Sequence, residues 1–262
     1  MDLSIVVPAY KQAPTIQQDL RSLSAFLDSL HTSYELILVI DGDIDDTALI
    51  VKQDDTLAHV RIIPIKKNHG KGYALKQGFL ASSGNIVGFI DAGGDIEFNC
   101  LRLMFELMQF THADIVIGSK RHPLSQVQYP LVRHIYSFSY QLLNRMLFRL
   151  NIRDTQVGVK LFRKDALTQI LPHVQINKFA FDLELLVHAH ALGFTHIIES
   201  PVRITHKFNS TIGFGVIIET LYDTIRLYFR NEPRQLNVKP SSGISVSYSP
   251  SSSQTTIKEH VR

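Results

Sequence analysis

The stretch Gly84–Phe98, GNIVGFIDAGGDIEF, is the segment that best indicates which fold this sequence adopts. An apolar run over residues 86–90 stops at Asp91, and two glycines and Asp95 follow. A buried strand that ends in acids and glycines is typical of open α/β sheets, which bind ligands at the carboxyl edge of their strands. Acids at such an edge can hold a hard cation, and the cation can hold phosphates. A solvated turn explains the stretch equally well in isolation, so the surrounding segments must distinguish the two.

The composition is that of a globular chain. Its 262 residues, 45% hydrophobic and 19% charged, can bury one large core. The formal net charge of +3, with acids and bases interspersed, gives no indication of a nucleic-acid partner. The single cysteine, Cys100, excludes an intramolecular disulfide and fits a reducing compartment. The sequence shows neither a signal-peptide pattern at its start nor an apolar window long enough for a transmembrane helix, so we expect a cytoplasmic location.

Strands and helices are expected to alternate through the first 120 residues. Short apolar runs predict strands at Leu3–Val7, Glu35–Ile40, Val60–Ile65, Ile86–Ile90 and Asp114–Gly118. Helical periodicity lies between them, for example over Thr15–Leu30, where leucines recur on one face. This alternation at short spacing predicts the α/β class, with a mainly parallel, doubly wound, Rossmann-like sheet flanked by helices.

The second half of the chain predicts helices that combine apolar and basic residues. Tyr129–Leu150 and Ile212–Phe229 both mix aliphatic and aromatic residues with arginines. Helices at a membrane interface have this amphipathic pattern, and so do core helices with a basic outer face. Asp154–Arg163 predicts a loop that leads into a strand, and Phe181–Leu192 predicts a helix. Serine, proline and glycine dominate after residue 230, so we expect one domain over residues 1–230 and a disordered tail over 231–262.

Charged residues follow three of the predicted strands. Asp41 ends the second strand, Asp91 and Asp95 follow the fourth, and Lys120 and Arg121 follow the fifth. The carboxyl ends of parallel strands share one edge of a sheet, where acids can hold a metal ion and bases can neutralise phosphates. The sequence therefore indicates a site for a metal-bridged diphosphate, although each strand end taken singly is also compatible with a simple solvated turn.

Ordered motifs in this chain resemble the family 2 glycosyltransferases of GT-A fold. The motifs are VVPAYKQ at Val6–Gln12, IDGDIDDT at Ile40–Thr47, KNHGKGYALKQGF at Lys67–Phe79 and FIDAGGDI at Phe89–Ile96. Two more, DTQVGVKLFRKDAL at Asp154–Leu167 and FAFDLELL at Phe179–Leu186, resemble the branch that contains dolichyl-phosphate glucosyltransferases and dolichol-phosphate mannose synthases. The resemblance covers roughly residues 3–210. It implies inverting transfer of a hexose from a UDP- or GDP-sugar to a polyprenyl phosphate, such as dolichyl or undecaprenyl phosphate.

The resemblance implies a donor site built from several segments. It assigns contacts with the nucleotide sugar to Pro8, Ala9, Tyr10, Asp41, Lys71, Gly72, Asp91, Lys120, Arg121 and Gln156. The Asp-x-Asp motif of the family is altered here, because Gly93 stands in the place of the second acid. Asp95 lies where relatives carry a glutamine that can face the metal, so we expect Asp91 and Asp95 to hold Mg²⁺ or Mn²⁺. The alternative is a metal-independent site in which the basic residues supply the positive charge.

For catalysis the resemblance indicates Asp91, Asp182 and Arg133. Asp182 belongs to an acidic helix start that supplies the catalytic base in relatives with hydroxyl acceptors, although the helix dipole alone also favours acids there. A phosphate acceptor is already ionised at neutral pH, so Asp182 could instead orient a cation such as Arg133. We also expect Lys160 and Arg163 to help hold phosphate.

A polyprenyl phosphate acceptor implies contact with a membrane surface. We therefore expect peripheral attachment at the cytoplasmic face, either directly or through a membrane-bound partner. Two alternatives stay open. One is transfer to a sugar hydroxyl in surface-polysaccharide synthesis. The other is a non-catalytic nucleotide-sugar-binding protein, because Ile40 and Gly93 replace acids that relatives use. No G-x-G-x-x-G follows the first strand, which argues against a dehydrogenase.

Overall fold

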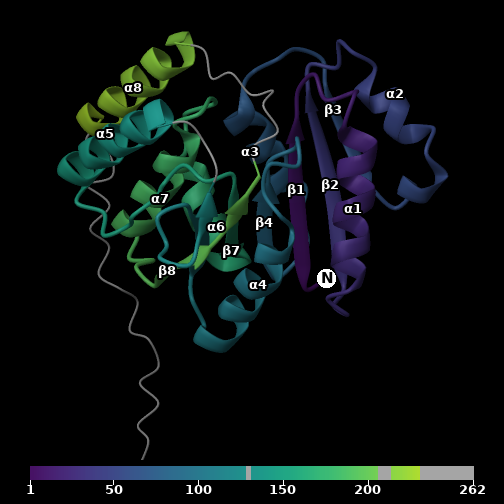
Figure 1. Cartoon of the computed structure of the whole chain (residues 1–262), viewed down its shortest axis with the longest axis horizontal. Coiled ribbons are helices and arrows are strands. Elements are labelled where there is room, and N and C mark those ends of the chain that lie inside the picture. Colours follow the sequence, from purple (N-terminus) through teal and green to yellow (C-terminus); the bar gives the residue numbers. More distant parts are fainter. Residues whose placement is uncertain (128–130, 206–213, 231–262) are drawn as a thin grey trace, which may run out of the picture.

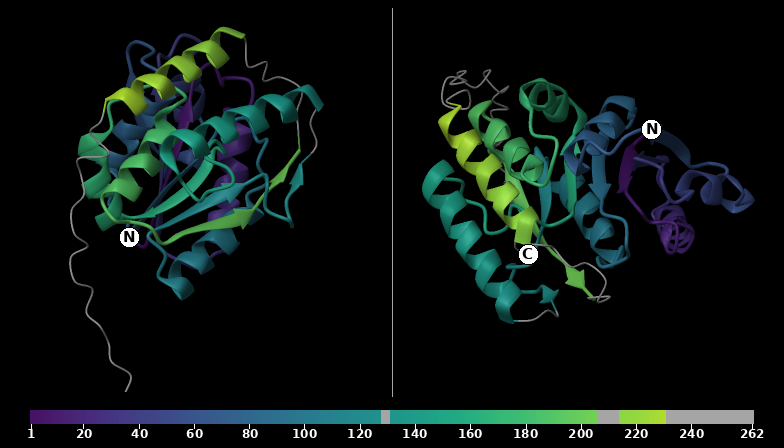
Figure 2. Two further views of the ribbon diagram at one scale, coloured as in Figure 1. Left: turned by 90° about the vertical axis from the view of Figure 1, so that its left-hand side faces the viewer. Right: turned by 90° about the horizontal axis from the view of Figure 1, so that it is seen from above.

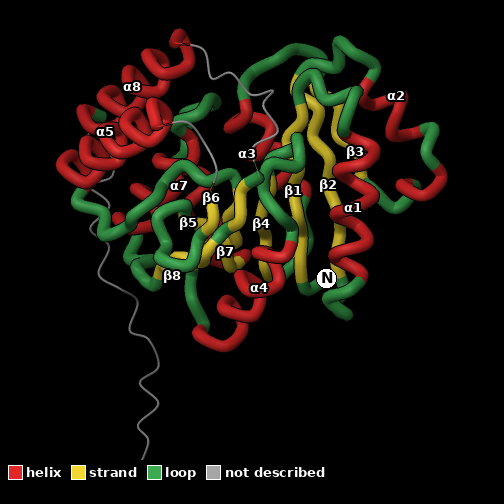
Figure 3. The backbone as a smooth tube through the Cα atoms, viewed as in Figure 1, coloured by secondary structure: helices red, strands yellow, loops and turns green. Residues whose placement is uncertain are grey.

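A seven-stranded sheet runs through the centre of the protein, as the computed structural model shows (Figures 1 and 3). The structure describes residues 1–127, 131–205 and 214–230. Along the sheet the order is β3-β2-β1-β4-β7-β5-β8. The strands are β1 (Leu3–Ala9), β2 (Tyr34–Asp41), β3 (Arg61–Ile65), β4 (Ile86–Ile90), β5 (Ile115–Ser119), β7 (Val159–Arg163) and β8 (Ile197–Pro201). β7 is antiparallel to β4 and β5, and the other pairs are parallel, so the predicted mainly parallel sheet is confirmed.

Helices cover both faces of the sheet. One face carries α1 (Ile16–Asp28), α2 (Thr47–Lys52), the 3₁₀ turn η1 (Asp55–Leu57) and α4 (Asn99–Thr111). The other face carries α3 (Lys71–Ala81), α6 (Lys164–Ile170), the 3₁₀ turn η2 (Leu171–His173) and α7 (Phe181–Ala191). Next to this second layer, α5 (Leu131–Phe148) and α8 (Phe214–Phe229) lie side by side (Figure 2). Both long helices predicted in the second half are therefore present, and the predicted tail, 231–262, lies outside the described residues.

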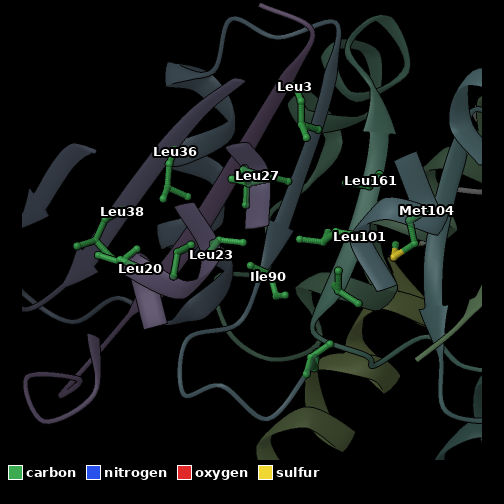
Figure 4. Packing of buried hydrophobic residues seen from close by; sticks show 14 of the residues in the cluster. Leu3, Leu20, Leu23, Leu27, Leu36, Leu38, Ile90, Leu101, Met104 and Leu161 are labelled. Atoms are coloured by element: carbon green, nitrogen blue, oxygen red, sulfur yellow. The ribbon is translucent and has the colours of Figure 1, made fainter. Parts of the chain in front are cut away.

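The near-continuous apolar strands are explained by two cores, one on each face of the sheet. In β1, Leu3 and Ile5 face one core, and Val6 faces the other. The first core receives the leucine stripe of α1, including Leu20 and Leu23, which Figure 4 shows packed against strand residues. Strands buried on both faces need apolar residues at every position rather than at alternate ones, which is the pattern expected for a sheet between two helical layers.

The strand order reverses between β1 and β4, and we call the edge of the sheet outside the carboxyl ends of these strands the crevice. β1 pairs with β2 on one side and with β4 on the other, so the chain winds in opposite directions from this point. Open α/β sheets bind ligands outside the carboxyl ends of the strands at such a reversal. The carboxyl ends of β1, β2, β4 and β5 all lie at this edge, which is where the sequence predicted the charged residues to gather.

The antiparallel direction of β7 contradicts one sequence-based expectation. Because β7 runs against β4, its last residue, Arg163, pairs with Ile86 at the amino end of β4. The Arg163 guanidinium donates to the carbonyl oxygens of Ala113 and Met108, at 2.9 and 3.1 Å. Arg163 therefore lies at the edge opposite the crevice, and the expectation that it helps to hold phosphate there is wrong.

A small second sheet fixes the far end of the segment that follows β4. It pairs β6 (Gln126–Val127) with β9 (Arg203–Ile204), and Ile96 forms a bridge with Ile204. The Thr205 N–H donates to the Asp95 carbonyl oxygen at 3.0 Å. The loop that begins at Asp91 is thus held by a β-type contact at its end.

We predict that alanine at Gly78 destabilises the fold through the contact between α3 and the sheet. A Cβ atom there would lie 2.3 Å from Val6 Cγ1 and 3.1 Å from Val39 Cγ2. Overpacking of this kind costs about 1–3 kcal/mol, more than the ~1 kcal/mol that alanine gains in helix propensity. Gly215→Ala in α8 is the control, because a Cβ there meets nothing within 4 Å among the described residues. Denaturant unfolding measures both variants, and an unchanged midpoint for Gly78→Ala would contradict the close packing.

Candidate active site

The carboxyl end of β1 forms one wall of the crevice. Pro8 and Ala9 close the strand, and Tyr10 follows with 40% of its surface exposed. The ammonium of Lys11 lies 5.3 Å from the centre of the Tyr10 ring. An exposed aromatic ring at a strand end offers a flat face for a planar group, and the neighbouring cation favours an anionic ligand.

Asp41, at the end of β2, is buried and fixes a backbone turn. Its two carboxylate oxygens accept the N–H groups of His69 and Gly70, at 2.8 and 2.6 Å. Gly70 has φ of 107°, and a Cβ atom there would lie 2.5 Å from the Asn177 carbonyl oxygen, so the turn requires glycine. The carboxylate thereby sets where α3 begins. The predicted contact of Asp41 with the nucleotide stays a prediction.

Lys71 is the first residue of α3 and lies between two aspartates. Its Nζ is 2.8 Å from Asp91 Oδ1, 3.0 Å from Asp91 Oδ2 and 3.3 Å from Asp182 Oδ2. The same ammonium lies 5.0 Å from the centre of the Phe89 ring. Because Lys71 is the first residue of α3, its positive charge adds to the positive amino end of the helix dipole. Both favour the binding of an anion. Gly72 is buried, and a Cβ atom there would lie 2.6 Å from Phe181 Cβ, so the close approach of α3 to α7 requires glycine. The predicted contact of Gly72 with the donor stays a prediction.

Asp182, in the first turn of α7, joins Lys71 to a second lysine. Its Oδ1 lies 2.6 Å from the Nζ of Lys160, which also donates to the Val157 carbonyl oxygen at 2.7 Å. Lys160 is the second residue of β7 and has 0% of its surface exposed. We call the series Asp91–Lys71–Asp182–Lys160 the buried charge chain, although the side chain of Asp91, at its outer end, is 41% exposed. Because Lys160 is enclosed beneath the site, the expectation that it contacts phosphate is wrong.

The charges of the chain alternate, and each changes the titration of its neighbours. Burial alone raises the pKa of Asp182, but Lys160 and Lys71 outweigh it and hold that pKa below its usual value. Burial lowers the pKa of Lys160, against the opposing effect of Asp182. For Lys71 the two aspartates overcome burial, so its pKa is raised. Loss of hydration raises the pKa of Asp91, and Lys71 opposes that shift. Two aspartates and two lysines make a set that is net neutral when all four groups are ionised.

Gly158 allows Asp91 to take its position. The Asp91 N–H donates to the Gly158 carbonyl oxygen at 2.8 Å. A Cβ atom on Gly158 would lie 1.9 Å from Asp91 Oδ2, so no larger residue leaves room for this carboxylate. The loop before β7 thus holds Asp91, the residue that follows β4.

The end of β5 is tied to the segment before β7 by Asp154. This buried carboxylate accepts the N–H groups of Lys120 and Gln156, each at 3.0 Å. Among the described residues, the side-chain nitrogen of Gln156 is buried without a hydrogen-bond partner. The Arg121 guanidinium lies 5.4 Å from the centre of the Phe138 ring on α5. An unused amide donor and two cations thus lie at this end of the site.

The loop after β4 carries the expected metal ligands, Asp91 and Asp95. Within residues 1–127, 131–205 and 214–230, no group of three or more histidine, cysteine, aspartate or glutamate side chains converges. Carboxylate oxygens are the ligands that Mg²⁺ and Mn²⁺ prefer, but both oxygens of Asp91 lie within 3.0 Å of Lys71 Nζ, so the binding of an ion by Asp91 and Asp95 stays a prediction. Gly93 has φ of 104°, and its N–H donates to Asp19 at 3.0 Å. An acid at position 93 would be strained in this backbone.

Glu184, the second acid in the first turn of α7, lies apart from the buried charge chain. Glu184 is buried, and its Oε2 accepts the N–H groups of Gln175 and Ile176, at 3.0 and 2.6 Å. Its Oε1 lies 3.0 Å from Arg230, just after α8, so this acid stabilises the packing of α7 and α8. Arg133 lies on α5, but its side chain is outside the described part of the structure.

The sequence interpretation missed the three ion pairs of the buried charge chain. The signal for Lys160 was available, because it is the charged member of the otherwise apolar run Val159–Phe162. A charge within a buried strand needs a partner, since an unpaired buried ion is very costly. The pairing with Asp182 could not be read from the sequence, because the two residues come from different elements.

Known proteins share both the sequence pattern and the fold. The family model described as Glycosyl transferase family 2 matches residues 4–171. A dolichyl-phosphate beta-glucosyltransferase from Dictyostelium discoideum is 31% identical over 243 residues, which cover 87% of this chain and 74% of that protein. The Saccharomyces cerevisiae protein of the same name is 29% identical over 207 residues, which cover 71% of this chain and 62% of that protein.

Solved structures show the same architecture. Glucosyl-3-phosphoglycerate synthase from Mycobacterium tuberculosis in complex with UDP has a TM-score of 0.68 at 18% identity, covering 87% of this chain and 80% of that one. A second structure of that enzyme, with Mn²⁺, UDP and glucosyl-3-phosphoglycerate, has a TM-score of 0.64 at 20% identity, covering 85% and 79%. The predicted GT-A fold is therefore confirmed.

We predict that Asp182→Asn lowers stability in a pH-dependent way. At pH 7 the variant leaves Lys160 buried without its counter-ion, which costs about 3–5 kcal/mol. The Asp182 pKa is depressed in the folded protein, so its stabilisation is present above the unfolded value of about 4 and is lost as pH falls through the folded value. The difference between wild type and variant therefore shrinks below about pH 4.

Urea unfolding at several pH values measures this difference. Asp55→Asn is the control, because Asp55 is exposed and such surface changes are usually within about 0.5 kcal/mol. A difference between wild type and Asp182→Asn that stays constant with pH would contradict the ion-pair account.

Proposed function

Because the chain belongs to glycosyl transferase family 2, we propose that it is an inverting hexosyltransferase that moves a sugar from a UDP- or GDP-sugar to a polyprenyl phosphate. Relatives named dolichyl-phosphate beta-glucosyltransferase support this acceptor class. In the proposed reaction an oxygen of the lipid phosphate attacks the anomeric carbon of the sugar. The bond from that carbon to the diphosphate oxygen breaks, and the nucleoside diphosphate leaves with the electron pair.

The environment of Asp182 favours a phosphate acceptor over a hydroxyl acceptor. A hydroxyl acceptor needs a general base within hydrogen-bond reach. Asp182 is buried, and both of its oxygens already bind lysines, at 2.6 and 3.3 Å. Its lowered pKa also makes it a weak base. A phosphate monoester has its second pKa near 6 and is largely ionised at pH 7, so it can attack without a base. We therefore assign Asp182 to holding Lys71 rather than to proton abstraction.

The cations at the sheet edge suit the donor diphosphate. Lys71, with the amino end of α3, would bind a phosphate oxygen, and Lys120 and Arg121 would face it from the end of β5. Asp91 would keep Lys71 in place before the donor binds, and Gln156 would supply an uncharged donor. A bound Mg²⁺ or Mn²⁺, held by Asp91 and Asp95, would neutralise charge that develops on the leaving diphosphate.

We predict that the wild-type protein transfers radiolabelled sugar to undecaprenyl phosphate. A panel of UDP- and GDP-sugars, each with added Mg²⁺ or Mn²⁺, identifies the donor by the appearance of label in an organic extract. Lipid-linked sugar partitions into the organic phase, whereas polysaccharide stays in water. Label that enters only an aqueous polymer would support a sugar-hydroxyl acceptor instead, and nucleotide-sugar binding without any turnover would support a non-catalytic protein.

We predict that Asp91→Asn lowers the rate of sugar transfer. The amide keeps the size of the side chain but removes the charge that holds Lys71, so we expect transfer to fall at least about 10²-fold, equivalent to about 2.7 kcal/mol of transition-state stabilisation. Asp165→Asn, on α6, is the control, because α6 begins at the edge of the sheet opposite the crevice. Unchanged transfer by Asp91→Asn would remove this residue from the site.

We also propose that the outer surfaces of α5 and α8 contact the bilayer that carries the acceptor. Apolar side chains are exposed along both helices: Phe138, Leu142, Met146, Ile218, Leu221, Tyr222, Ile225 and Phe229. Their spacing is that of one helical stripe on each helix. Exposed Arg145, Arg149 and Arg226 accompany them and would favour anionic lipids.

The inward sides of the same helices combine apolar and polar contacts. Leu227 is buried in the core, Tyr140 Oη lies 2.7 Å from Thr224 Oγ1, Gln141 donates to the Ile152 carbonyl oxygen, and Asn144 donates to Thr155. The inner side therefore has its partners within the protein, whereas the exposed stripes have an apolar surface that favours an apolar partner. Among the described helices, none is both long and apolar enough to cross a membrane.

We predict that the protein co-floats with vesicles that contain anionic lipid, and that Met146→Glu combined with Phe229→Glu abolishes flotation. These side chains are 71% and 72% exposed, and burial of each contributes about 1.5–3 kcal/mol, so binding should fall at least tenfold. Phe110→Glu, 81% exposed on α4, is the control. Transfer to a short-chain, water-soluble polyprenyl phosphate should be unaffected. Equal flotation of wild type and double variant would contradict the bilayer contact, as would wild-type binding that requires a membrane protein.

A further inference from the structure

Lys160 is a charged residue in the interior that the proposed reaction does not use directly. Its ammonium is enclosed between Asp182 Oδ1 at 2.6 Å, the Val157 carbonyl oxygen at 2.7 Å and the Phe89 ring, whose centre is 5.3 Å away. In other proteins, replacement of both members of a buried ion pair by apolar side chains is often neutral or stabilising, whereas removal of one member alone is costly. Packing alone therefore does not explain a lysine here.

The charge of Lys160 determines how strongly Asp182 holds Lys71. Asp182 divides its two oxygens between the two lysines, and the pair to Lys160 is the shorter, at 2.6 against 3.3 Å. Both lysines also lie over the same Phe89 ring. Without Lys160, Lys71 would be the single strong counter-ion of a buried Asp182 and would be drawn away from the crevice. The four-charge chain would also become net negative and would repel an incoming diphosphate.

We propose that Lys160 is a positioning residue for the donor: by neutralising one oxygen of Asp182, it leaves Lys71 available to bind the donor diphosphate. The inference rests on the proposed function, because it concerns the same site. Lys160 itself touches no substrate. It acts through Asp182, and its effect is therefore on donor affinity rather than on acceptor affinity.

The test measures nucleoside diphosphate binding by calorimetry, with whichever of UDP and GDP the wild-type protein binds more tightly. Lys160→Met should raise the Kd at least about tenfold, the scale expected from the loss of one unit charge near a partly buried site. The KM for the donor sugar should rise in parallel, and the KM for the polyprenyl phosphate should not change. Lys164→Met is the control. Lys164 is a half-buried lysine of the same region of the chain, but its ammonium donates to Ser82 at the opposite edge of the sheet.

A double variant separates positioning from a general structural role. Lys160→Met with Asp182→Asn removes both members of the pair, so Lys71 is no longer drawn inward and the remaining Lys71–Asp91 pair is neutral. Its Kd should lie at least about threefold below that of Lys160→Met. If Lys160→Met fails to fold, Lys160→Gln, which keeps a hydrogen-bond donor for Asp182 without the charge, takes its place in this comparison.

The outcomes are distinct. A wild-type Kd in Lys160→Met, or a double variant that binds no better than the single variant, overturns the positioning role. If the wild-type protein transfers sugar to lipid while Lys160→Met keeps full donor affinity, the inference fails and the proposed function stands. A wild-type protein that binds no nucleoside diphosphate overturns both.

Discussion

The ion pair between Lys160 and Asp182 is the interaction on which the site depends. It joins the second residue of β7 to the first turn of α7, and both side chains are buried. A buried lysine and a buried aspartate are each very costly alone, so neither residue is tolerated unless the strand and the helix are both in place. Asp182 then reaches Lys71 at the start of α3, and Lys71 reaches Asp91 at the end of β4. Four distant segments are therefore fixed relative to one another by alternating charges.

The antiparallel direction of β7 makes this arrangement possible. Because β7 starts at the edge where its neighbours β4 and β5 end, the segment before it contributes backbone groups to the crevice. The Gly158 carbonyl oxygen binds the Asp91 N–H, and the Val157 carbonyl oxygen binds the Lys160 ammonium. A parallel strand at this place would bring its carboxyl end, with Arg163, to the crevice instead. Because β7 is reversed, the site contains the carbonyl oxygens of Val157 and Gly158 and the enclosed Lys160, and it does not contain Arg163.

Local patterns in the sequence predicted the strands and the edge of the sheet at which the charged residues lie. They did not predict the direction of β7 or the partners of the charged side chains. The apolar run before Asp91 correctly indicated a buried strand, because burial on both faces is visible in consecutive residues. Strand direction is decided by contacts between distant segments, so the placement of Arg163 was wrong. Asp41 was correctly placed at a strand end, yet its carboxylate is occupied by two backbone N–H groups from a turn 28 and 29 residues away. Partners at that distance leave no local signature.

The altered Asp-x-Asp motif is consistent with the same electrostatic account. At position 93 the backbone has φ of 104°, where an acid would be strained and glycine is not. Asp91 therefore has no adjacent acid, and Lys71 lies within 3.0 Å of both of its oxygens. A second carboxylate beside Asp91 would make the buried charge chain net negative and bind Lys71 more tightly. With glycine there the chain is neutral when all four groups are ionised, so in the proposed reaction the charge of the donor diphosphate would be balanced by Lys120, Arg121 or a cation that enters with the donor.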